Sequence, residues 1–355
     1  MRRALVVGTG LIGGSIGLAL RALGWHVTGS DIDAVRSERA YELGAIDEIG
    51  DDPDAEITFI AVPVSKVVEL SKSALARLTP TRKTAVVTDV GSVKSSIVDF
   101  IDHPCFIGGH PMAGSEAIGI EGANEHLFQN ATWVLTPTAN TDYDAYFLLR
   151  ETIESLGSSV LELTPSQHDS VVAVVSHVPY LLAVSLMNIA TRKAQENIPL
   201  LKLAAGGFKD MTRIAGSDPT IWPDICAQNS NSIARTLDDL LNELVAIRDD
   251  IAKGDRETIM PLLSTASLAR RSLPSLSLPP STPHQLTEIR IPVEDRLGVL
   301  AEVTTLAASL GVNIEDITIV SLGVLSLIVD QHFTAKFVEE LKELGYLPIV
   351  YEVLE

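Results

Sequence analysis

The sequence has little cysteine and few basic residues for its length. Its two cysteines, Cys105 and Cys226, lie far apart with no histidine cluster beside them, so we expect buried thiols in a reducing compartment and neither a disulfide nor a zinc site. Lysine and arginine number 27 against 46 aspartates and glutamates, which gives a net charge of −19. This acidity argues against nucleic acid or an anionic membrane surface as the partner, although a local cluster of cations could still hold an anionic substrate.

Long hydrophobic runs are also missing from the sequence. We find no apolar run that approaches the ~20 residues needed to cross a bilayer. The N-terminus passes from Met1 directly into an expected strand without a signal-peptide pattern, so we expect a cytoplasmic protein with no membrane partner. What the chain does contain is 46% hydrophobic residues over 355 positions, which suits two or three domains with cores of their own.

The first 164 residues alternate short apolar runs with helical stretches. Runs that are apolar almost throughout are typical of parallel strands covered by helices on both faces, so we expect an α/β Rossmann domain over residues 1–164. The strands are expected at Ala4–Val7, His26–Ser30, Ile57–Val62, Ala85–Thr88, Cys105–Gly108 and Trp133–Thr136.

Two further folded segments and a linker follow. Residues 165–271 carry helical patterns, including one long amphipathic helix at Ala234–Lys253, which indicates an all-helical domain suited to dimerisation. Residues 272–284 hold four prolines and no regular period, which marks a linker. Residues 285–355 predict a ferredoxin-like α+β module in βαββαβ order. Its strands are expected at Glu288–Val293, Asp316–Val320, Leu325–Val329 and Pro348–Val353, and its helices at Gly298–Leu310 and Ala335–Leu344.

A glycine-rich loop follows the first expected strand and matches the GxGxxG pattern of dinucleotide-binding sites. Gly8 allows a tight turn, Gly10 lets phosphates approach the backbone, and Gly13 lets the next helix pack closely on the strand. A pyrophosphate would then bind the N-terminus of that helix, where N–H groups and the helix dipole favour negative charge. Leu11 and Ile12 complete this loop.

An acidic residue at the end of the second strand indicates which dinucleotide binds. Asp31 lies about 20 residues beyond the glycines, where a carboxylate accepts hydrogen bonds from the ribose hydroxyls and repels a 2′-phosphate. NAD is therefore favoured, although Arg36 and Arg39 are near enough to leave some use of NADP open. Val62 and Pro63, at the end of a later expected strand, are expected to contact the same cofactor.

One histidine lies where dehydrogenase chemistry could use it. His110 follows a predicted strand in a glycine-rich loop, at the edge of the sheet where α/β proteins bind ligands. A neutral imidazole there can accept the proton of a hydroxyl group while hydride leaves the same carbon. Ser92, at the end of the preceding strand, could reach the same crevice, or could cap a helix.

The helical domain offers charged and aromatic candidates. Lys209 and Arg213 are four residues apart after Gly206, and Arg213 could hold a carboxylate in a bidentate pair. His177 and Tyr180 are three apart on one helix, beside a proline. The pair His168-Asp169, at the start of that helix, is interpreted as a helix cap.

Four motifs together make the chain resemble the prephenate dehydrogenase family over residues 1 to about 270. They are GHPMAGSE at residues 109–116, DVGSVK at 89–94, SHVP at 176–179 and GGFKDMTRIA at 206–215. The C-terminal segment resembles an ACT domain, carried by VEDRLGVLAE at 293–302 and GVNI at 311–314.

This resemblance implies the oxidative decarboxylation of prephenate to 4-hydroxyphenylpyruvate with NAD, on the route to tyrosine. It implies that His110 takes the proton of the ring hydroxyl, that Ser92 is its hydrogen-bond partner, and that Arg213 binds a substrate carboxylate. Tyr180 stands where the family often has a histidine that recognises the substrate side chain, so arogenate stays open as the substrate. The resemblance also implies a homodimer and an effector at the ACT domain, tyrosine or another amino acid. The pocket would be lined by Gly206, Lys209, His177, Tyr180 and Trp222.

Three rival functions remain at this point. Arogenate dehydrogenase would share every catalytic feature. A different hydroxyacid dehydrogenase with a helical dimer domain would typically use a catalytic lysine and lack the HPMAG segment. A non-catalytic amino-acid sensor that kept the nucleotide fold would not need His110, Ser92 and Arg213 together.

Overall fold

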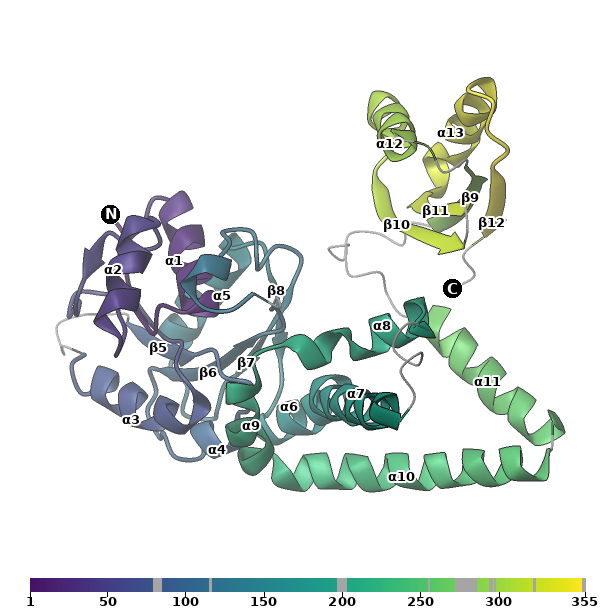
Figure 1. Cartoon of the computed structure of the whole chain (residues 1–355). Helices are drawn as coiled ribbons and strands as arrows, with labels where there is room; N and C mark the ends of the chain where they lie inside the picture. Colours follow the sequence, from purple (N-terminus) through teal and green to yellow (C-terminus); the bar gives the residue numbers. More distant parts are fainter. Residues whose placement is uncertain are drawn as a thin grey trace. The chain divides into compact units, whose positions relative to one another are not determined.

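The computed structural model describes residues 1–78, 85–114, 117–196, 203–254, 256–271, 286–293, 296, 298–321 and 324–352. The chain divides into two compact units, Met1–Asp249 and Asp250–Glu355 (Figure 1). The predicted linker at 272–284 lies outside the described residues, as do Ser115 and Glu116 of the histidine loop.

A sheet of eight strands organises the first unit. The strand order is β3-β2-β1-β4-β5-β6-β7-β8. The order reverses between β1 and β4, and the crevice at the carboxyl ends of two such strands is where open α/β sheets bind ligands. The strands are β1 (Arg3–Val7), β2 (His26–Ser30), β3 (Glu48–Ile49), β4 (Ile57–Ile60), β5 (Val86–Asp89), β6 (Phe106–Pro111), β7 (Thr132–Thr136) and β8 (Ser159–Glu162).

Helices pack on both faces of this sheet (Figure 1). On one face, α1 (Leu11–Ala22), α2 (Ala34–Glu42) and α5 (Tyr143–Ser155) bury one apolar core against the strands. On the other face, α3 (Val64–Leu75) and α4 (Ser95–Val98) bury a second core, which also takes in Ile225 from the helical segment. This arrangement confirms the predicted Rossmann-like domain.

The far end of the sheet corrects the expectation of a parallel sheet. β7 pairs antiparallel with β6, and β8 then pairs parallel with β7. The apolar run at Trp133–Thr136 predicted the strand, but apolar composition carries no information about strand direction. The edge strands β3 and β8 were not predicted, because they are short and largely exposed and therefore lack an apolar run.

The helical segment of the first unit begins directly after β8. Its first helices are interrupted by a π-helical turn, Ala173–His177, just before Pro179. Proline has no N–H to donate and disturbs the preceding turn, and π turns are frequent at functional sites. The helices are α6 (Pro165–Val172), α7 (Val178–Glu196), α8 (Gly206–Thr212), α9 (Trp222–Gln228) and α10 (Ser230–Lys253).

The stretch Pro165–Ala194 is long and apolar enough to cross a membrane by length and composition alone. This finding corrects the expectation that no apolar stretch approaches that length, which followed from counting uninterrupted runs only. Core helices pass the same test. Within this stretch, the side chains of His168, Asp169 and His177 are buried and hydrogen-bonded inside the protein, and 33% of its most apolar window is buried.

The second unit contains α11 (Arg256–Arg271) and a small α+β module. The module has the predicted βαββαβ order and an antiparallel sheet of four strands ordered β10-β11-β9-β12, as in ferredoxin-like folds. Two helices and the inner face of the sheet enclose its core, which includes Ile289, Leu327 and Phe337. The elements are β9 (Leu286–Pro292), α12 (Val299–Ser309), β10 (Ile314–Ser321), β11 (Val324–Asp330), α13 (Gln331–Glu343) and β12 (Ile349–Glu352).

Candidate active site

The turn between β1 and α1 is shaped by contacts that exclude side chains. Gly8 has a φ of +94°, and a Cβ there would lie 2.2 Å from the carbonyl oxygen of Ala61. A Cβ on Gly13 would lie 1.9 Å from the carbonyl oxygen of Gly8, whereas a Cβ on Gly10 would meet nothing within 4 Å. The helix α1 starts after Gly10 with no side-chain cap and no acidic residue in its first turn. The open approach at Gly10 and the uncapped helix N-terminus therefore fit the pyrophosphate of a dinucleotide.

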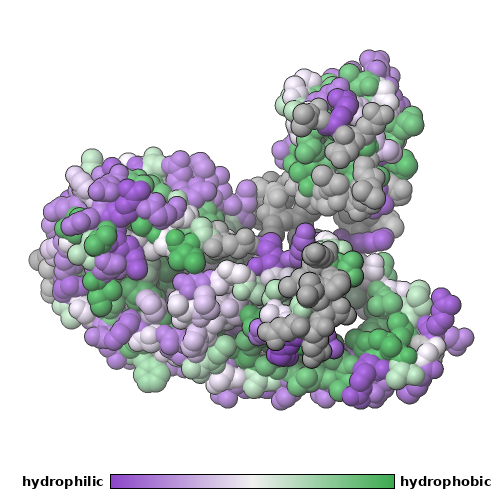
Figure 2. Space-filling view, viewed as in Figure 1, coloured by the Kyte–Doolittle hydropathy of each residue, from purple (hydrophilic) through white to green (hydrophobic). Residues whose placement is uncertain are grey.

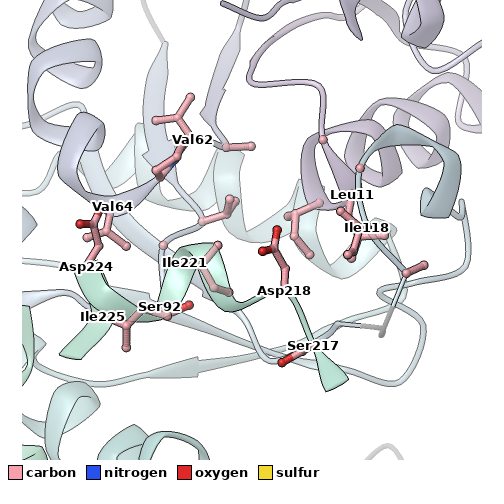
Figure 3. A pocket seen from close by; sticks show the side chains of 18 of the residues that line it. Leu11, Val62, Val64, Ser92, Ile118, Ser217, Asp218, Ile221, Asp224 and Ile225 are labelled. Carbon is pink, nitrogen blue, oxygen red and sulfur yellow. The ribbon is translucent and has the colours of Figure 1, made fainter. Parts of the chain in front are cut away.

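A cavity of about 360 Å³ lies beside this turn. Figure 3 shows that the nucleotide domain supplies Leu11, Ile118 and Val62 to its walls, while Asp218 and Ile221 come from the helical segment. The cavity therefore lies at the switch point of the sheet, with the helical segment closing one side. Its remaining walls include Gly10, Ile12, Arg36, Ala61, Pro63, Val64, Gly91, Ser92, Ser217, Asp224 and Ile225.

The predicted cofactor residues divide into two groups. Gly10, Leu11, Ile12, Val62 and Pro63 line the cavity. The other three, Gly8, Gly13 and Asp31, shape the glycine-rich turn from behind.

Asp31 is nearly buried and holds the turn through its carboxylate. Its Oδ2 accepts the N–H of Thr9 at 2.9 Å, and its Oδ1 accepts the N–H of Asp33 at 3.0 Å. Arg36 lies 3.4 Å from Oδ1 and lines the cavity, whereas Arg39 is held in ion pairs with Glu121 and Glu42. Each carboxylate oxygen can accept a second bond, so contact with ribose hydroxyls stays a prediction that this geometry permits.

His110 lies in β6 and joins a chain of three side chains. Its Nδ1 is 2.8 Å from Nε2 of His168, and Nδ1 of His168 is 2.8 Å from Oδ1 of Asp169. The predicted bond between Ser92 and His110 is not among the hydrogen bonds of the described residues, so Ser92 as the partner of His110 stays a prediction. Ser92 does line the cavity. The structure thus pairs the candidate base with α6 of the helical segment.

A fully buried ion pair supports the loop that carries Ser92 and the strand that carries His110. Lys94 and Asp89 are both completely buried, and the Lys94 ammonium contacts Oδ2 of Asp89. Asp89 also accepts the N–H groups of Gly91 at 2.8 Å and Gly109 at 3.2 Å. The Asp89 carboxylate therefore links the loop after β5 to β6, the strand that contains His110.

Burial keeps the histidines of this region neutral. Desolvation lowers the pKa of His110 well below its usual 6.5, and the neighbouring His168, Lys94 and His177 lower it further. Desolvation also lowers the pKa of His168 and takes the pKa of His177 to about 4. A neutral imidazole at neutral pH is the form that can accept a proton, so His110 is suited to act as a general base.

His177, Tyr180 and Trp222, all predicted substrate-pocket residues, lie together. Tyr180 stacks on Trp222 with ring centroids 3.5 Å apart, and His177 meets the edge of Trp222 at 6.1 Å. Nδ1 of His177 lies 3.2 Å from the side-chain amide nitrogen of Asn229, which can only donate. Nδ1 of His177 therefore accepts, and its Nε2 carries the hydrogen. The Nε2 of His177 and the indole Nε1 of Trp222 are buried without a partner among the described residues, which leaves two donors for an acceptor group.

The other substrate candidates lie on the exposed side of the helical segment. Gly206 begins α8, Lys209 lies within it, and all three of Gly206, Lys209 and Arg213 are exposed. The α-helix ends at Thr212 and continues as a 3₁₀ turn from Arg213, so the expected single helix face is interrupted. None of the three lines the cavity of the described residues, and their role in substrate binding stays a prediction.

The sequence analysis did not predict that α6 of the helical segment contributes side chains to the site. His168-Asp169 was interpreted as a helix cap, but Thr164 and Gln167 form the capping box of α6. Asp169 instead accepts the backbone N–H groups of Lys94 at 2.7 Å and Ser95 at 2.9 Å. No sequence pattern marks such a contact between residues about 75 positions apart, so only the fold could reveal it.

Comparisons with known proteins agree over most of the chain. Residues 16–162 match the nucleotide-binding domain of prephenate dehydrogenase, and residues 164–265 match its dimerization domain. The prephenate dehydrogenase of Bacillus subtilis is 35% identical over 333 residues, which cover 89% of this chain and 87% of the relative.

Two solved structures are similar at nearly equal identity. Prephenate dehydrogenase from A. aeolicus, in complex with hydroxyphenyl propionate and NAD⁺, is 32% identical with a TM-score of 0.70, and the match covers 76% of this chain and 97% of that one. Synechocystis arogenate dehydrogenase is 33% identical with a TM-score of 0.64, over 76% of this chain and 98% of the other. Overall identity therefore does not separate the two substrates.

Proposed function

The chain belongs to the prephenate dehydrogenase family, and from this premise we propose that it oxidises prephenate with NAD⁺ to 4-hydroxyphenylpyruvate and CO₂. The observation that carries the proposal is the neutral His110 in β6, hydrogen-bonded to His168, in the same unit as the cavity beside the glycine-rich turn. The curated relatives and the A. aeolicus complex with NAD⁺ support the same activity and cofactor.

The reaction balances with one base and no further reactant. The ring carbon that carries the hydroxyl group loses a hydride, which NAD⁺ accepts when bound. His110 accepts the hydroxyl proton, and the electrons of the breaking carbon–carboxylate bond complete the aromatic ring as CO₂ leaves. The proton then returns from His110 to the phenolate oxygen or to solvent. Because aromatisation drives the loss of CO₂, the protein needs only to align the two reactants and hold the proton.

Charged side chains account for the binding of a dianionic substrate by an acidic protein. Arg213 would hold a carboxylate in a bidentate pair, with Lys209 beside it on the same segment. The unpartnered donors of His177 and Trp222 would face a carboxylate or carbonyl oxygen. Ser92, at the cavity wall, would bond the substrate hydroxyl group or the free nitrogen of His110.

Arogenate is the second candidate substrate, because Tyr180 leaves the recognition of the substrate side chain open. Tyr180 replaces a histidine that often recognises the substrate side chain in this family, and its ring is occupied by stacking on Trp222. A neutral hydroxyl group at this position would donate a hydrogen bond to the keto oxygen of prephenate or accept one from the ammonium group of arogenate.

The experiment that tests the substrate follows NADH formation with prephenate and with arogenate, each with NAD⁺ and with NADP⁺. We expect the largest kcat/KM with prephenate and NAD⁺, because Asp31 would repel a 2′-phosphate. A larger kcat/KM with arogenate would leave the proposed mechanism unchanged and identify arogenate as the substrate. Preference for NADP⁺ would contradict the role given to Asp31.

A homodimer formed through the helical segment would cover the apolar side chains that this segment exposes. On α6 and the π turn these are Val171, Val174 and Val175, spaced as one helix face. Figure 2 shows hydrophobic residues along α10, where Leu241 and Val245 are exposed. The match to a dimerization domain supports this assembly. Light scattering should give twice the mass of the chain, and a stable monomer would contradict it.

The C-terminal module fits an ACT domain that binds an amino acid such as tyrosine. The ferredoxin-like topology of this module supports the proposal. Unchanged kinetics and melting temperature at millimolar tyrosine would count against tyrosine as the effector. A cytoplasmic location stays a prediction.

A further inference from the structure

The side chains of His168 and Asp169 make a continuous hydrogen-bonded path to His110. His168 is completely buried, its ring centroid lies 5.1 Å from that of His110, and the two rings meet at 68°. Each of the two links in the path, from Asp169 to His168 and from His168 to His110, measures 2.8 Å. The path starts in α6 of the helical segment and ends in β6 of the nucleotide domain.

Asp169 can only accept hydrogen bonds in this position. Burial alone would raise the pKa of Asp169, but bonds from His168 and from the N–H groups of Ser95 and Lys94 outweigh it and lower that pKa. An ionised carboxylate has no proton to donate, so the nitrogen of His168 that faces it must carry a hydrogen.

The proton positions along the rest of the path follow from this acceptor. Each ring is neutral and carries one hydrogen, because burial lowers the pKa of both histidines. With its hydrogen on Nδ1, His168 presents the lone pair of Nε2 to His110. His110 must therefore donate from Nδ1, which leaves the lone pair on its own Nε2.

We propose that His168 and Asp169 are positioning residues that hold His110 in the tautomer whose Nε2 accepts the substrate proton, and that they stabilise the imidazolium that then forms. This inference deepens the proposed function and rests on His110 being its base. The same logic applies to other acid–histidine pairs in which a carboxylate selects the histidine tautomer. It also means that the base is fully prepared only when α6 is packed against the nucleotide domain.

A purely structural role for the pair makes a different prediction. If His168 only filled space, any side chain of similar size would replace it, and the nitrogen that carries the hydrogen in His110 would not depend on Asp169. Asp169→Ala removes the acceptor that fixes the hydrogen of His168 on Nδ1, so His168 and His110 can each exchange between their two tautomers.

The test combines ¹⁵N NMR of histidine-labelled full-length protein with steady-state kinetics. The His110 signals are assigned by their loss in His110→Asn. In the wild type we expect Nδ1 of His110 to have the shift of a protonated nitrogen and Nε2 that of an unprotonated one. In Asp169→Ala we expect the shifts of the two nitrogens to move towards each other, kcat to fall by roughly 10²-fold or more, and KM and the Kd for NAD⁺ to change little.

Two further variants separate positioning from folding. His168→Gln retains an acceptor for the Nδ1–H group of His110 and should keep kcat within about tenfold of wild type, whereas His168→Leu has no acceptor and should lose roughly 10²-fold. Ser170→Ala, one residue along the helix on its exposed side, should behave as wild type. Equal kcat in the Gln and Leu variants, or an unchanged His110 tautomer in Asp169→Ala, would overturn the proposal. The NMR result needs no substrate, so it stands or falls separately from the assignment of prephenate.

Discussion

Lys94→Met should destabilise the first unit far more than the loss of an ordinary ion pair. Lys94 and Asp89 are both completely buried, so removing the ammonium leaves a carboxylate out of water with two N–H donors, from Gly91 and Gly109. Breaking a buried pair on one side typically costs about 3–5 kcal/mol. Lys66→Met removes an exposed pair with Glu69 and should cost at most about 0.5 kcal/mol.

The assay is urea unfolding followed by tryptophan fluorescence, since Trp25, Trp133 and Trp222 all lie in the first unit. Adding Asp89→Asn to Lys94→Met should recover part of the stability, because it removes the isolated charge. Equal losses in Lys94→Met and Lys66→Met, or no recovery of stability on adding Asp89→Asn to Lys94→Met, would refute the reasoning.

Three further predictions concern the cofactor turn, the substrate and pH. Gly13→Ala should lower the melting temperature and abolish NAD⁺ binding, because its Cβ meets a backbone oxygen at 1.9 Å. Gly10→Ala should keep the melting temperature and lose only NAD⁺ affinity. Calorimetry measures the melting temperature and the NAD⁺ affinity of both variants. Arg213→Ala should raise the KM for prephenate at least tenfold and leave the Kd for NAD⁺ unchanged. A variant that only binds NAD⁺ more weakly would contradict the assignment of Arg213 to the substrate. His177 has its pKa lowered from 6.5 to about 4, so the unfolded chain binds the extra proton between these values. Stability is therefore complete above pH 6.5 and falls by about 2 kcal/mol from this group by pH 5, and His177→Gln should reduce the fall measured by urea unfolding.

The sequence predicted the parts of the fold that depend on local patterns. Apolar runs placed β2 at the observed residues and most other strands within a few residues, because buried parallel strands need continuous apolar sequence. The direction of β7 could not be predicted in this way, because it depends on which neighbour the strand pairs with.

The residues of the site also divide into those that a local sequence pattern predicts and those that depend on long-range packing. The glycine-rich turn is local, so Gly8, Gly10 and Gly13 could be assigned roles that the backbone contacts now explain. The partners of His110 are not local, since His168 lies 58 residues away in a different domain and its neighbours predict only a helix. Long-range pairing of polar side chains becomes visible only when the packing of two domains is known.

The measurement that tests the central claim most directly is NADH formation from prephenate by the wild type and by His110→Asn, both saturated with NAD⁺. The wild type should release NADH and 4-hydroxyphenylpyruvate in equal amounts. The variant should bind NAD⁺ with unchanged affinity and lose roughly 10²–10⁴-fold in kcat, the usual contribution of a general base. Near-normal turnover in the variant would contradict the role of His110, and no turnover by the wild type with prephenate or arogenate would return a non-catalytic sensor to consideration.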